Sequence, residues 1–231
     1  MKTNNFTLIV PIAGDSQEFA KQMPLAFRQD EAGMMLCVKA ILGLPLHIFS
    51  NIFFVIIKKH DLLYSLRERM AIQFKINKLD KAQVLILDNA TSSQPETINE
   101  AIKKAGIVGA IFVKDADGFF KADEIIAQNG VALFPLEELS IVDPQHKSYV
   151  AVDDMNYITN IIERRVVSNL FNAGGYCFEK ADEYCKYYER LKNYGKLYLS
   201  HIIYSMLLDK ISFRPIEIKE YDDWAMYDTY K

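Results

Sequence analysis

The feature that most constrains the fold of this chain is the alternation of short apolar runs with helical segments over its first half. Each run is rich in β-branched and aromatic residues and is bounded by glycine, proline or polar residues, which is typical of a buried strand. Repeated strand-helix-strand order predicts an α/β fold with a largely parallel central sheet and helices on both faces. The predicted strands span residues 6–13, 51–57, 83–87 and 109–113, and the predicted helices span residues 34–44, 60–74 and 95–105.

The pattern changes after residue 120. The strand candidates 148–152 and 157–163 are separated by the polar turn D-D-M-N at 153–156, which predicts antiparallel pairing. We expect one domain over residues 1–231, with a soft internal boundary near residue 120. Its second half is predicted to contain further strands at 131–134 and 211–218 and helices at 177–188 and 198–208.

Composition restricts the classes of partner. Half of the 231 residues are apolar, which is enough for a substantial core, and the net charge is −3. Because no long basic run occurs, neither nucleic acid nor a membrane is expected as a partner. Small ligands are the expected partners. Three cysteines without a C-x-x-C pair, no signal peptide and no apolar segment of transmembrane length favour a cytoplasmic protein. The tyrosine-rich segment 184–198 is expected in the core or at a contact of a homo-oligomer.

The stretch V-K-D-A-D-G-F-F at 113–120 ends the fourth predicted strand and is the candidate catalytic centre. Side chains two apart on an extended chain share a face, so Asp115 and Asp117 are expected to point into the crevice at the strand ends, where open α/β sheets bind ligands. Mg²⁺ or Mn²⁺ held jointly with substrate phosphates would offset the repulsion between the carboxylates. The alternative is a polar loop that leaves a strand.

Two glycine positions suggest close approach of a ligand. Gly14 follows the first strand, where backbone N–H groups can bind phosphate or a base edge. Gly174 and Gly175 interrupt a strand-like run at 173–178, which predicts that a ligand or another backbone lies against them. The four histidines lack metal-ligand spacing, and no G-x-S-x-G occurs, so neither a histidine-based nor a serine hydrolase is expected.

Four separated stretches resemble the sugar-phosphate nucleotidyltransferase family, particularly its capsule-biosynthesis-like members with a glycosyltransferase-A-type fold. L-I-V-P-I-A-G-D-S-Q-E-F at 8–19 with M-P-L-A-F at 23–27 is similar to the family's first loop, P-x-A-G-x-G-x-R-F followed by P-K. T-S-S-Q-P-E-T at 91–97 resembles its base-closing turn, and V-K-D-A-D-G-F-F its metal-binding I-K-D-x-D-N-x-F. The fourth stretch comprises K-S-Y-V at 147–150, I-I-E-R-R-V-V-S-N at 161–169, A-G-G-Y-C-F at 173–178, Y-L-S-H-I-I at 198–203 and Y-D-D-W at 221–224.

The resemblance implies a nucleotide-binding half at 1–120 and an acceptor-binding half at 121–231. It also implies attack by a phosphate oxygen of a small phosphorylated acceptor on the α-phosphorus of a nucleoside triphosphate, with release of pyrophosphate, in surface-polysaccharide synthesis. Little covalent help is needed for this reaction beyond in-line positioning and cations around the charged transition state. The implied residues are Asp115, Asp117 and Asp223 for Mg²⁺ or Mn²⁺, with Lys114 beside them as catalytic; Ala13, Gly14, Asp15, Ser16, Gln94 and Thr97 for the nucleotide; and Glu163, Asn169, Gly174 and Gly175 for the acceptor.

The chain departs from the family pattern where phosphate charge is bound. The loop arginine of the family falls on Glu18 and the lysine of its P-K on Leu25, so the first loop is degenerate. Two lost charge-assisted contacts at about 1.5 to 3 kcal/mol each would lower turnover severely unless other cations replace them. Glycines of the family are also replaced, by Ser16 and Ser93, and the closing D-W-G-T reads D-W-A-M. The candidate replacement cations are Lys21, Arg28 and Lys114.

Two other functions stay open on the sequence. A glycosyltransferase of the same fold would use the D-x-D to hold the diphosphate of an already activated sugar. A degenerate member would keep the fold as a module that binds nucleotides without turnover.

Overall fold

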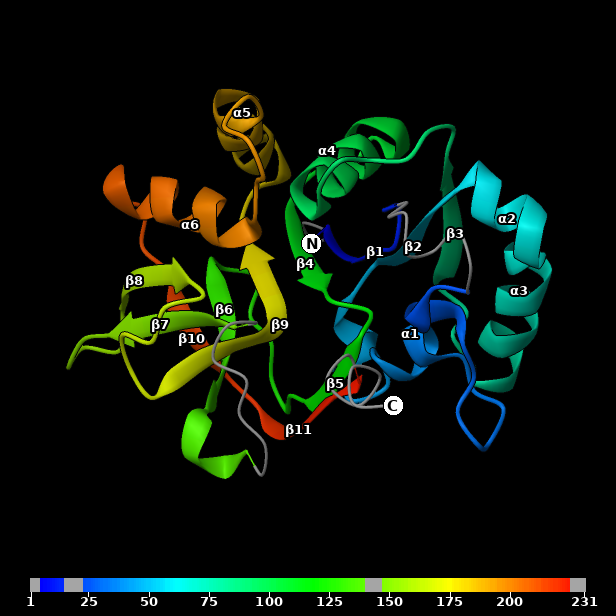
Figure 1. Ribbon diagram of the computed structural model, residues 1–231, viewed down its shortest axis with the longest axis horizontal. Helices are drawn as coiled ribbons and strands as arrows, with labels where there is room; N and C mark the ends of the chain where they lie inside the picture. The colour runs from blue at the N-terminus through cyan, green and yellow to red at the C-terminus, as the bar shows by residue number, and fades with distance from the viewer. Residues whose placement is uncertain (1–4, 15–22, 140–146, 225–231) are drawn as a thin grey trace.

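A computed structural model describes residues 5–14, 23–139 and 147–224 of the chain. Within these residues the centre is a nine-stranded sheet whose main path has the order β10-β6-β9-β4-β1-β2-β3 (Figure 1). The parallel part is formed by β1 (Phe6–Pro11), β2 (Asn51–Ile57), β3 (Ala82–Leu87) and β4 (Ala110–Lys114). The predicted largely parallel α/β sheet is confirmed.

Alternate residues of β1 point to opposite faces of the sheet, and each face has its own core. Leu8 and Val10 are fully buried in one cluster, which includes residues of α1 (Leu36–Lys39) and α3 (Leu66–Ile76). Ile9 is fully buried in the other, with residues of α4, α5 and α6. The period of two along the strand therefore places helices on both faces, as predicted. The bounds of these last helices are α4 Gln94–Ala105, α5 Ala181–Leu191 and α6 Leu199–Leu208.

Two predicted helices differ from the structure in the first half. The helix expected at 60–74 is two helices, α2 (Lys58–Tyr64) and α3, because Ser65 between them has a φ of 50° in the left-handed region. The helix expected at 34–44 is α-helical only in α1, and the chain continues in tighter turns. Gly43 lies in these turns, where a Cβ would be 2.1 Å from the Phe120 carbonyl oxygen. Packing of the chain against the backbone at Phe120 therefore replaces the last helical turn.

The second half adds antiparallel strands to the sheet. β9 (Leu170–Phe178) lies between β4 and β6 (Gly130–Pro135) and is antiparallel to both. The helix predicted from residue 177 is wrong at its start, because Phe178 is fully buried as a strand residue paired with Ile111, and α5 begins only at Ala181. The remaining strands of this sheet are β7 (Ser148–Val152) and β8 (Ile158–Glu163), which pair antiparallel, and β10 (Arg214–Glu217), which is parallel to β6.

A short two-stranded ribbon was not predicted from the sequence. It consists of β5 (Gly118–Lys121) and β11 (Lys219–Asp223), antiparallel and side by side in Figure 1, with Gly118 opposite Asp223. Both strands are short and of mixed polarity, so neither has a clear hydrophobic period. The ribbon brings the end of the described chain to the D-x-D. Among the described helices, none has the length and apolar character needed to cross a membrane.

Candidate active site

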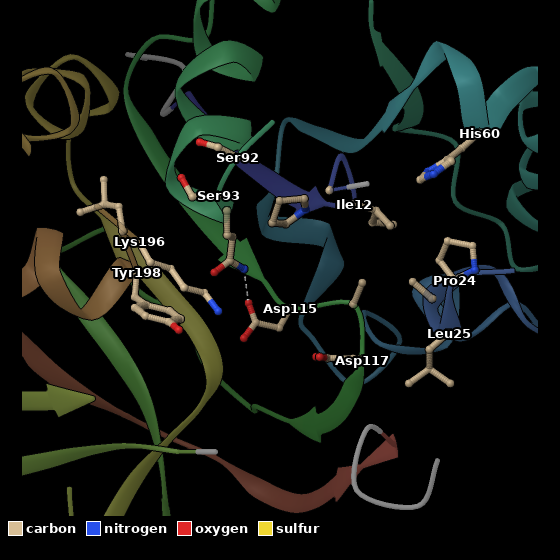
Figure 2. Close-up of a pocket in the computed structure, with 16 residues that line it drawn as sticks. Ile12, Pro24, Leu25, His60, Ser92, Ser93, Asp115, Asp117, Lys196 and Tyr198 are labelled. Carbon is tan, nitrogen blue, oxygen red and sulfur yellow. Dashed lines mark hydrogen bonds between the residues drawn. The ribbon is translucent and has the colours of Figure 1, made fainter. Parts of the chain in front are cut away.

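A cavity of about 610 Å³ opens at the carboxyl ends of β1 and β4, a size typical of small-ligand sites. Figure 2 shows Asp115 and Asp117 between two walls, with Lys196 and Tyr198 on one side and Pro24, Leu25 and His60 on the other. The cavity is also lined by Pro11, Ile12, Gly14, Ala26, Ser92, Ser93, Gln94, Ala116 and Leu197.

The D-x-D turn is held in place by the side chain of Lys114. The side chain of Lys114 is fully buried, and its Nζ donates to the carbonyl oxygens of Asp115 at 2.8 Å and Gly118 at 2.9 Å. The ammonium lies 4.7 Å from the centre of the Phe120 ring. Burial lowers the pKa of Lys114 to about 8, while the neighbouring aspartates oppose that shift. Lys114 therefore shapes the turn that carries the aspartates, and its ammonium is directed at backbone oxygens.

Gly174 allows Asp115 to sit against β9. The backbone N–H of Asp115 donates to the Gly174 carbonyl at 2.8 Å. Gly174 has a φ of 81°, and a Cβ there would be 2.7 Å from Asp115 Oδ2. At Gly175, a Cβ would be 2.7 Å from the ring of Phe120. The groups that approach Gly174 and Gly175 closely are therefore parts of the protein, the Asp115 side chain and the Phe120 ring.

The two aspartates repel each other at the strand end, where Asp115 is partly buried and Asp117 is exposed. Burial, reinforced by the Asp117 carboxylate and opposed by Lys114, raises the pKa of Asp115 to about 6. Burial also raises the pKa of Asp117, opposed by Lys114 and reinforced by Asp223. Because the side chain of Asp117 remains exposed to solvent, screening weakens this effect. A shared cation would relieve the repulsion.

The predicted base-closing turn contacts the first loop. Thr91 N donates to the carbonyl of Ala13 at 3.0 Å, and Thr91 forms an isolated bridge with Gly14. Thr97 is buried, and its hydroxyl is 2.6 Å from that of Thr91, so Thr97 supports the turn from inside. Ser93 accepts a hydrogen bond from the backbone N–H of Glu96 and caps α4.

Gln94 joins this turn to the D-x-D. Its Nε2 donates to Asp115 Oδ1 at 2.5 Å. The two predicted nucleotide-binding elements and the predicted catalytic strand end therefore border one cavity. Asp15 and Ser16 lie outside the described residues, as do the departure at Glu18 and the candidate cation Lys21. The guanidinium of Arg28 donates from Nε to the Met23 carbonyl at 3.0 Å.

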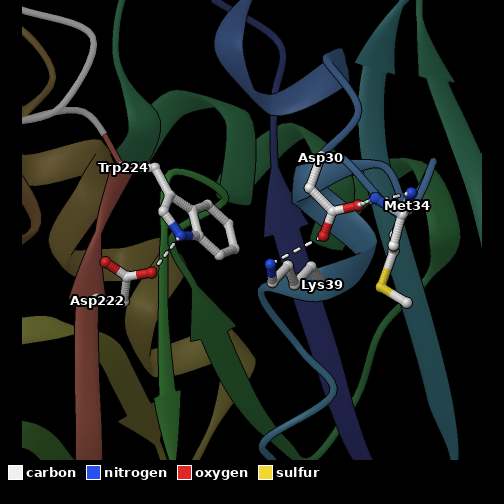
Figure 3. A network of polar contacts seen from close by, with 6 residues as sticks. Asp30, Met34, Lys39, Asp222 and Trp224 are labelled. Carbon is white, nitrogen blue, oxygen red and sulfur yellow. Dashed lines mark hydrogen bonds and ion pairs between the residues drawn. The ribbon is translucent and has the colours of Figure 1, made fainter.

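The closing D-D-W segment is held against the D-x-D. Trp224 N donates to the carbonyl of Asp117 at 3.0 Å, which extends the ribbon to the predicted metal site. Figure 3 shows the Trp224 indole N–H bonded to Asp222 Oδ2 at 2.8 Å, with Lys39, itself paired with Asp30 at 2.8 Å, nearby. The Lys39 ammonium is 5.7 Å from the centre of the indole. Asp223 thus lies beside the D-x-D segment, paired in the ribbon with Gly118.

The carboxylate of Asp223 has a partner of its own. It forms an ion pair with Lys147 Nζ and accepts a hydrogen bond from the Tyr221 hydroxyl at 3.1 Å. No group of three or more His, Cys, Asp or Glu side chains in the described ranges is arranged to hold a metal ion. Asp115 and Asp117, which line the cavity and repel each other, are hard oxygen donors that fit a divalent ion. The three-aspartate site stays a prediction.

The acceptor side differs in part from the predicted residues. Glu163 accepts hydrogen bonds from the hydroxyls of Ser148 at 2.6 Å and Ser200 at 2.7 Å, which fix its carboxylate. Asn169 is exposed, and its carbonyl accepts from Leu136 N at 2.7 Å. Neither Glu163 nor Asn169 is among the residues that line the cavity.

Three lining residues were missed by the sequence analysis. The ammonium of Lys196 lies 5.3 Å from the centre of the Tyr198 ring, and the guanidinium carbon of Arg164 lies 5.8 Å from it. His60 is buried in the opposite wall, edge-on to Phe27. Tyr198 lies inside a quoted motif and could have been found there, whereas Lys196 and His60 carry no local signal because only the fold brings them to the cavity.

The fold is shared with solved structures of nucleotide-transferring enzymes. The nucleoside-diphosphate-sugar pyrophosphorylase from Vibrio cholerae RC9 superimposes with a TM-score of 0.77 at 18% identity, over 96% of this chain and 97% of that one. The inositol-1-phosphate CTP transferase from T. maritima superimposes with a TM-score of 0.65 at 13% identity, over 95% of this chain and 88% of that one. A putative glucose-1-phosphate thymidylyltransferase from Bacillus anthracis has a TM-score of 0.68 at 15% identity, over 95% of this chain and 89% of that one. No protein-family model and no curated protein sequence matches the chain.

At these identities the likeness establishes the fold. The chain has the α/β architecture of these nucleotidyltransferases over nearly its whole length.

Proposed function

We propose that the protein is a metal-dependent nucleotidyltransferase that joins a nucleoside triphosphate to a sugar phosphate or a similar small phosphate ester. The observation that carries the proposal is the cavity itself. The cavity is bordered by the Gly14 loop and by the turn at Ser93 and Gln94, the strand end supplies Asp115 and Asp117, and Lys196 lies on the wall with Tyr198 (Figure 2). This arrangement occurs in a fold shared with three enzymes whose names describe nucleotidyl transfer.

In the proposed reaction, a phosphate oxygen of the acceptor forms a bond to the α-phosphorus, and the bond from that phosphorus to the bridging oxygen of pyrophosphate breaks. The chain's task is to align the two phosphates and to stabilise their charge. Backbone groups around Gly14 and the turn that Thr91 holds against Ala13 would fix the nucleotide. Lys196 is a lysine on the cavity wall and would bind phosphate oxygens in place of the family's missing loop cations.

Asp115 and Asp117 would hold Mg²⁺ or Mn²⁺, which when bound would supply Lewis-acid stabilisation of the phosphates. Gln94 would keep the carboxylate of Asp115 in place through its hydrogen bond. We place this chemistry in the cytoplasm and in surface-polysaccharide synthesis on the resemblance of the sequence motifs to capsule-biosynthesis-like members.

The test is pyrophosphate release from each nucleoside triphosphate with Mg²⁺ and a panel of sugar 1-phosphates and other small phosphate esters. One pairing should give stoichiometric pyrophosphate and a nucleotide-linked product by mass spectrometry. Asp117→Asn should lower kcat at least a hundredfold, because one donor to the cation is lost. Asp154→Asn, an exposed aspartate in the turn between β7 and β8, is the matched control and should leave turnover unchanged.

The alternatives give different results in parallel assays. Release of nucleoside diphosphate from a nucleotide sugar, without pyrophosphate from any triphosphate, would replace the proposal with a glycosyltransferase. Calorimetric binding of a nucleoside triphosphate with Mn²⁺ that is lost in an Asp115→Ala, Asp117→Ala double variant, without turnover on any acceptor, would indicate a binding module.

A further inference from the structure

Lys147 is a buried cation next to the candidate metal site. The side chain is 7% exposed, and its Nζ forms an ion pair with Asp223, whose side chain is 17% exposed. Nζ also lies 2.6 Å from the Tyr221 hydroxyl, which in turn donates to the same carboxylate oxygen of Asp223 at 3.1 Å. One carboxylate oxygen of Asp223 is therefore shared by an ammonium and a phenol.

The surroundings hold the ammonium in this place. Nζ lies 4.9 Å from the centre of the Tyr221 ring and 5.1 Å from that of Phe171, so two aromatic faces add cation-π attraction. The Phe171 and Tyr221 rings pack edge to face with centroids 5.2 Å apart. A buried lysine in such a setting is stable only when its charge is paired.

Asp223 therefore differs from the two other aspartates of the predicted set. Asp115 and Asp117 line the cavity, whereas Asp223 is not among the lining residues and its charge is balanced within the protein. A divalent cation at Asp223 would compete with a buried ammonium for the same carboxylate, and the charge of that ammonium would then be less well compensated. Within the described residues, the three aspartates are not arranged as one group that could hold a metal ion together.

We propose that Lys147 is the resident counter-ion of Asp223, and that a divalent cation in the cavity is held by Asp115 and Asp117 without Asp223. Lys147 then balances the charge of Asp223, at the end of β11, with a cation of the protein itself. The inference rests on the proposed function only in taking a divalent cation as a ligand of the cavity.

The test is Mn²⁺ binding by isothermal titration calorimetry to the intact protein without nucleotide, which requires no turnover. Asp223→Asn should bind Mn²⁺ within about threefold of the unmodified protein, whereas Asp117→Asn should bind at least about tenfold more weakly. Lys147→Met should strengthen binding at least about threefold, because it removes the ammonium that pairs with the carboxylate of Asp223. The double variant Lys147→Met, Asp223→Asn should return to the affinity of the unmodified protein.

Lys121→Met is the matched control, because Lys121 is an exposed lysine of the same ribbon, paired with Glu220 at 2.6 Å. It should leave the Mn²⁺ affinity unchanged. Folding of each variant is checked by circular dichroism, and if Lys147→Met does not fold, Asp223→Asn decides alone.

Three results would overturn the inference. The first is weakening by Asp223→Asn as large as that by Asp117→Asn, which would make Asp223 a metal ligand while Lys147 is present. The second is an unchanged or lower affinity in folded Lys147→Met. The third is absence of Mn²⁺ binding to the unmodified protein, because Asp115 and Asp117 would then not hold the cation by themselves. Failure of the proposed function is separate, because it is measured by pyrophosphate release.

Discussion

Replacing Asp115 by asparagine should stabilise the fold at neutral pH while removing function. Burial and the Asp117 carboxylate raise the pKa of Asp115 from its ordinary value of 3.8 to about 6, which means that the ionised form is disfavoured in the folded state. Asparagine is neutral and of nearly the same shape, and its amide oxygen can still accept the hydrogen bond from Gln94. The substitution therefore removes the cost of burying a negative charge, and the repulsion from Asp117, with little change in packing.

The magnitude follows from the shift in pKa. A rise from 3.8 to about 6 corresponds to about 3 kcal/mol of destabilisation once Asp115 is ionised in both states. Solvent in the cavity screens part of this, so we expect Asp115→Asn to raise the free energy of unfolding by about 1 to 3 kcal/mol.

The gain should depend on pH with a definite sign. Between pH 4 and 6 the folded state of the unmodified protein binds more protons than the unfolded state, so its stability falls as pH rises. The advantage of Asp115→Asn should thus be near zero at pH 4 and complete by pH 7 to 8. Urea unfolding at several pH values, without divalent ions, measures the difference.

Asp154→Asn is the matched control, because it makes the same chemical change at an exposed turn, and it should shift the free energy of unfolding by less than about 0.5 kcal/mol. Adding Mn²⁺ at pH 8 should reduce the advantage of Asp115→Asn, since only the unmodified protein gains the full stabilisation from binding. A loss of stability at pH 8, or a gain that is the same at pH 4, would refute the raised pKa of Asp115 from which the prediction is derived.

Three further substitutions test residues that support the D-x-D turn or the start of α4. Gly174→Ala should lower the free energy of unfolding by about 2 kcal/mol or more and weaken Mn²⁺ binding, because a Cβ there meets Asp115. Gly33→Ala is the control: Gly33 has a φ of 79° in open space, so the change should cost about 1 kcal/mol and leave Mn²⁺ binding intact. Equal weakening of Mn²⁺ binding by the two substitutions would contradict the role of Gly174. Lys114→Met should destabilise by about 2 to 4 kcal/mol in urea unfolding, since it orphans two carbonyl oxygens, and a neutral effect would show that water replaces the ammonium. Ser93→Ala should cost about 1 kcal/mol by loss of the α4 cap, and no change in thermal unfolding would argue against that cap.

Much of the first half of the fold could be predicted because its signals are local. The strand at 51–57 was predicted with the bounds that the structure has, and the helix at 95–105 begins one residue earlier than predicted. Fully apolar runs bounded by polar turns and the cap at Ser93 are readable without knowing any distant contact. The position of the D-x-D at the end of β4 follows from the same local pattern.

The predictions failed where a distant segment overrides local preference. Residues 177 and 178 lie both in the strand-like run at 173–178 and in the helix predicted at 177–188, and they belong to β9, which pairs with β4 and β6. The residues at 40–44 have helical propensity, but packing of Gly43 on the Phe120 carbonyl bends them into turns.

The sequence by itself determined the class of fold and the strand end at which two aspartates emerge, because hydrophobic period and turn chemistry act over a few residues. Only the tertiary structure decided how those aspartates are supported and which carboxylates share the cavity. Lys147 and Asp223 are 76 residues apart, and nothing local in either segment marks them as an ion pair. Charge pairing between distant segments depends on how β7 and β11 approach one another, and that approach is set by the packing of the whole molecule.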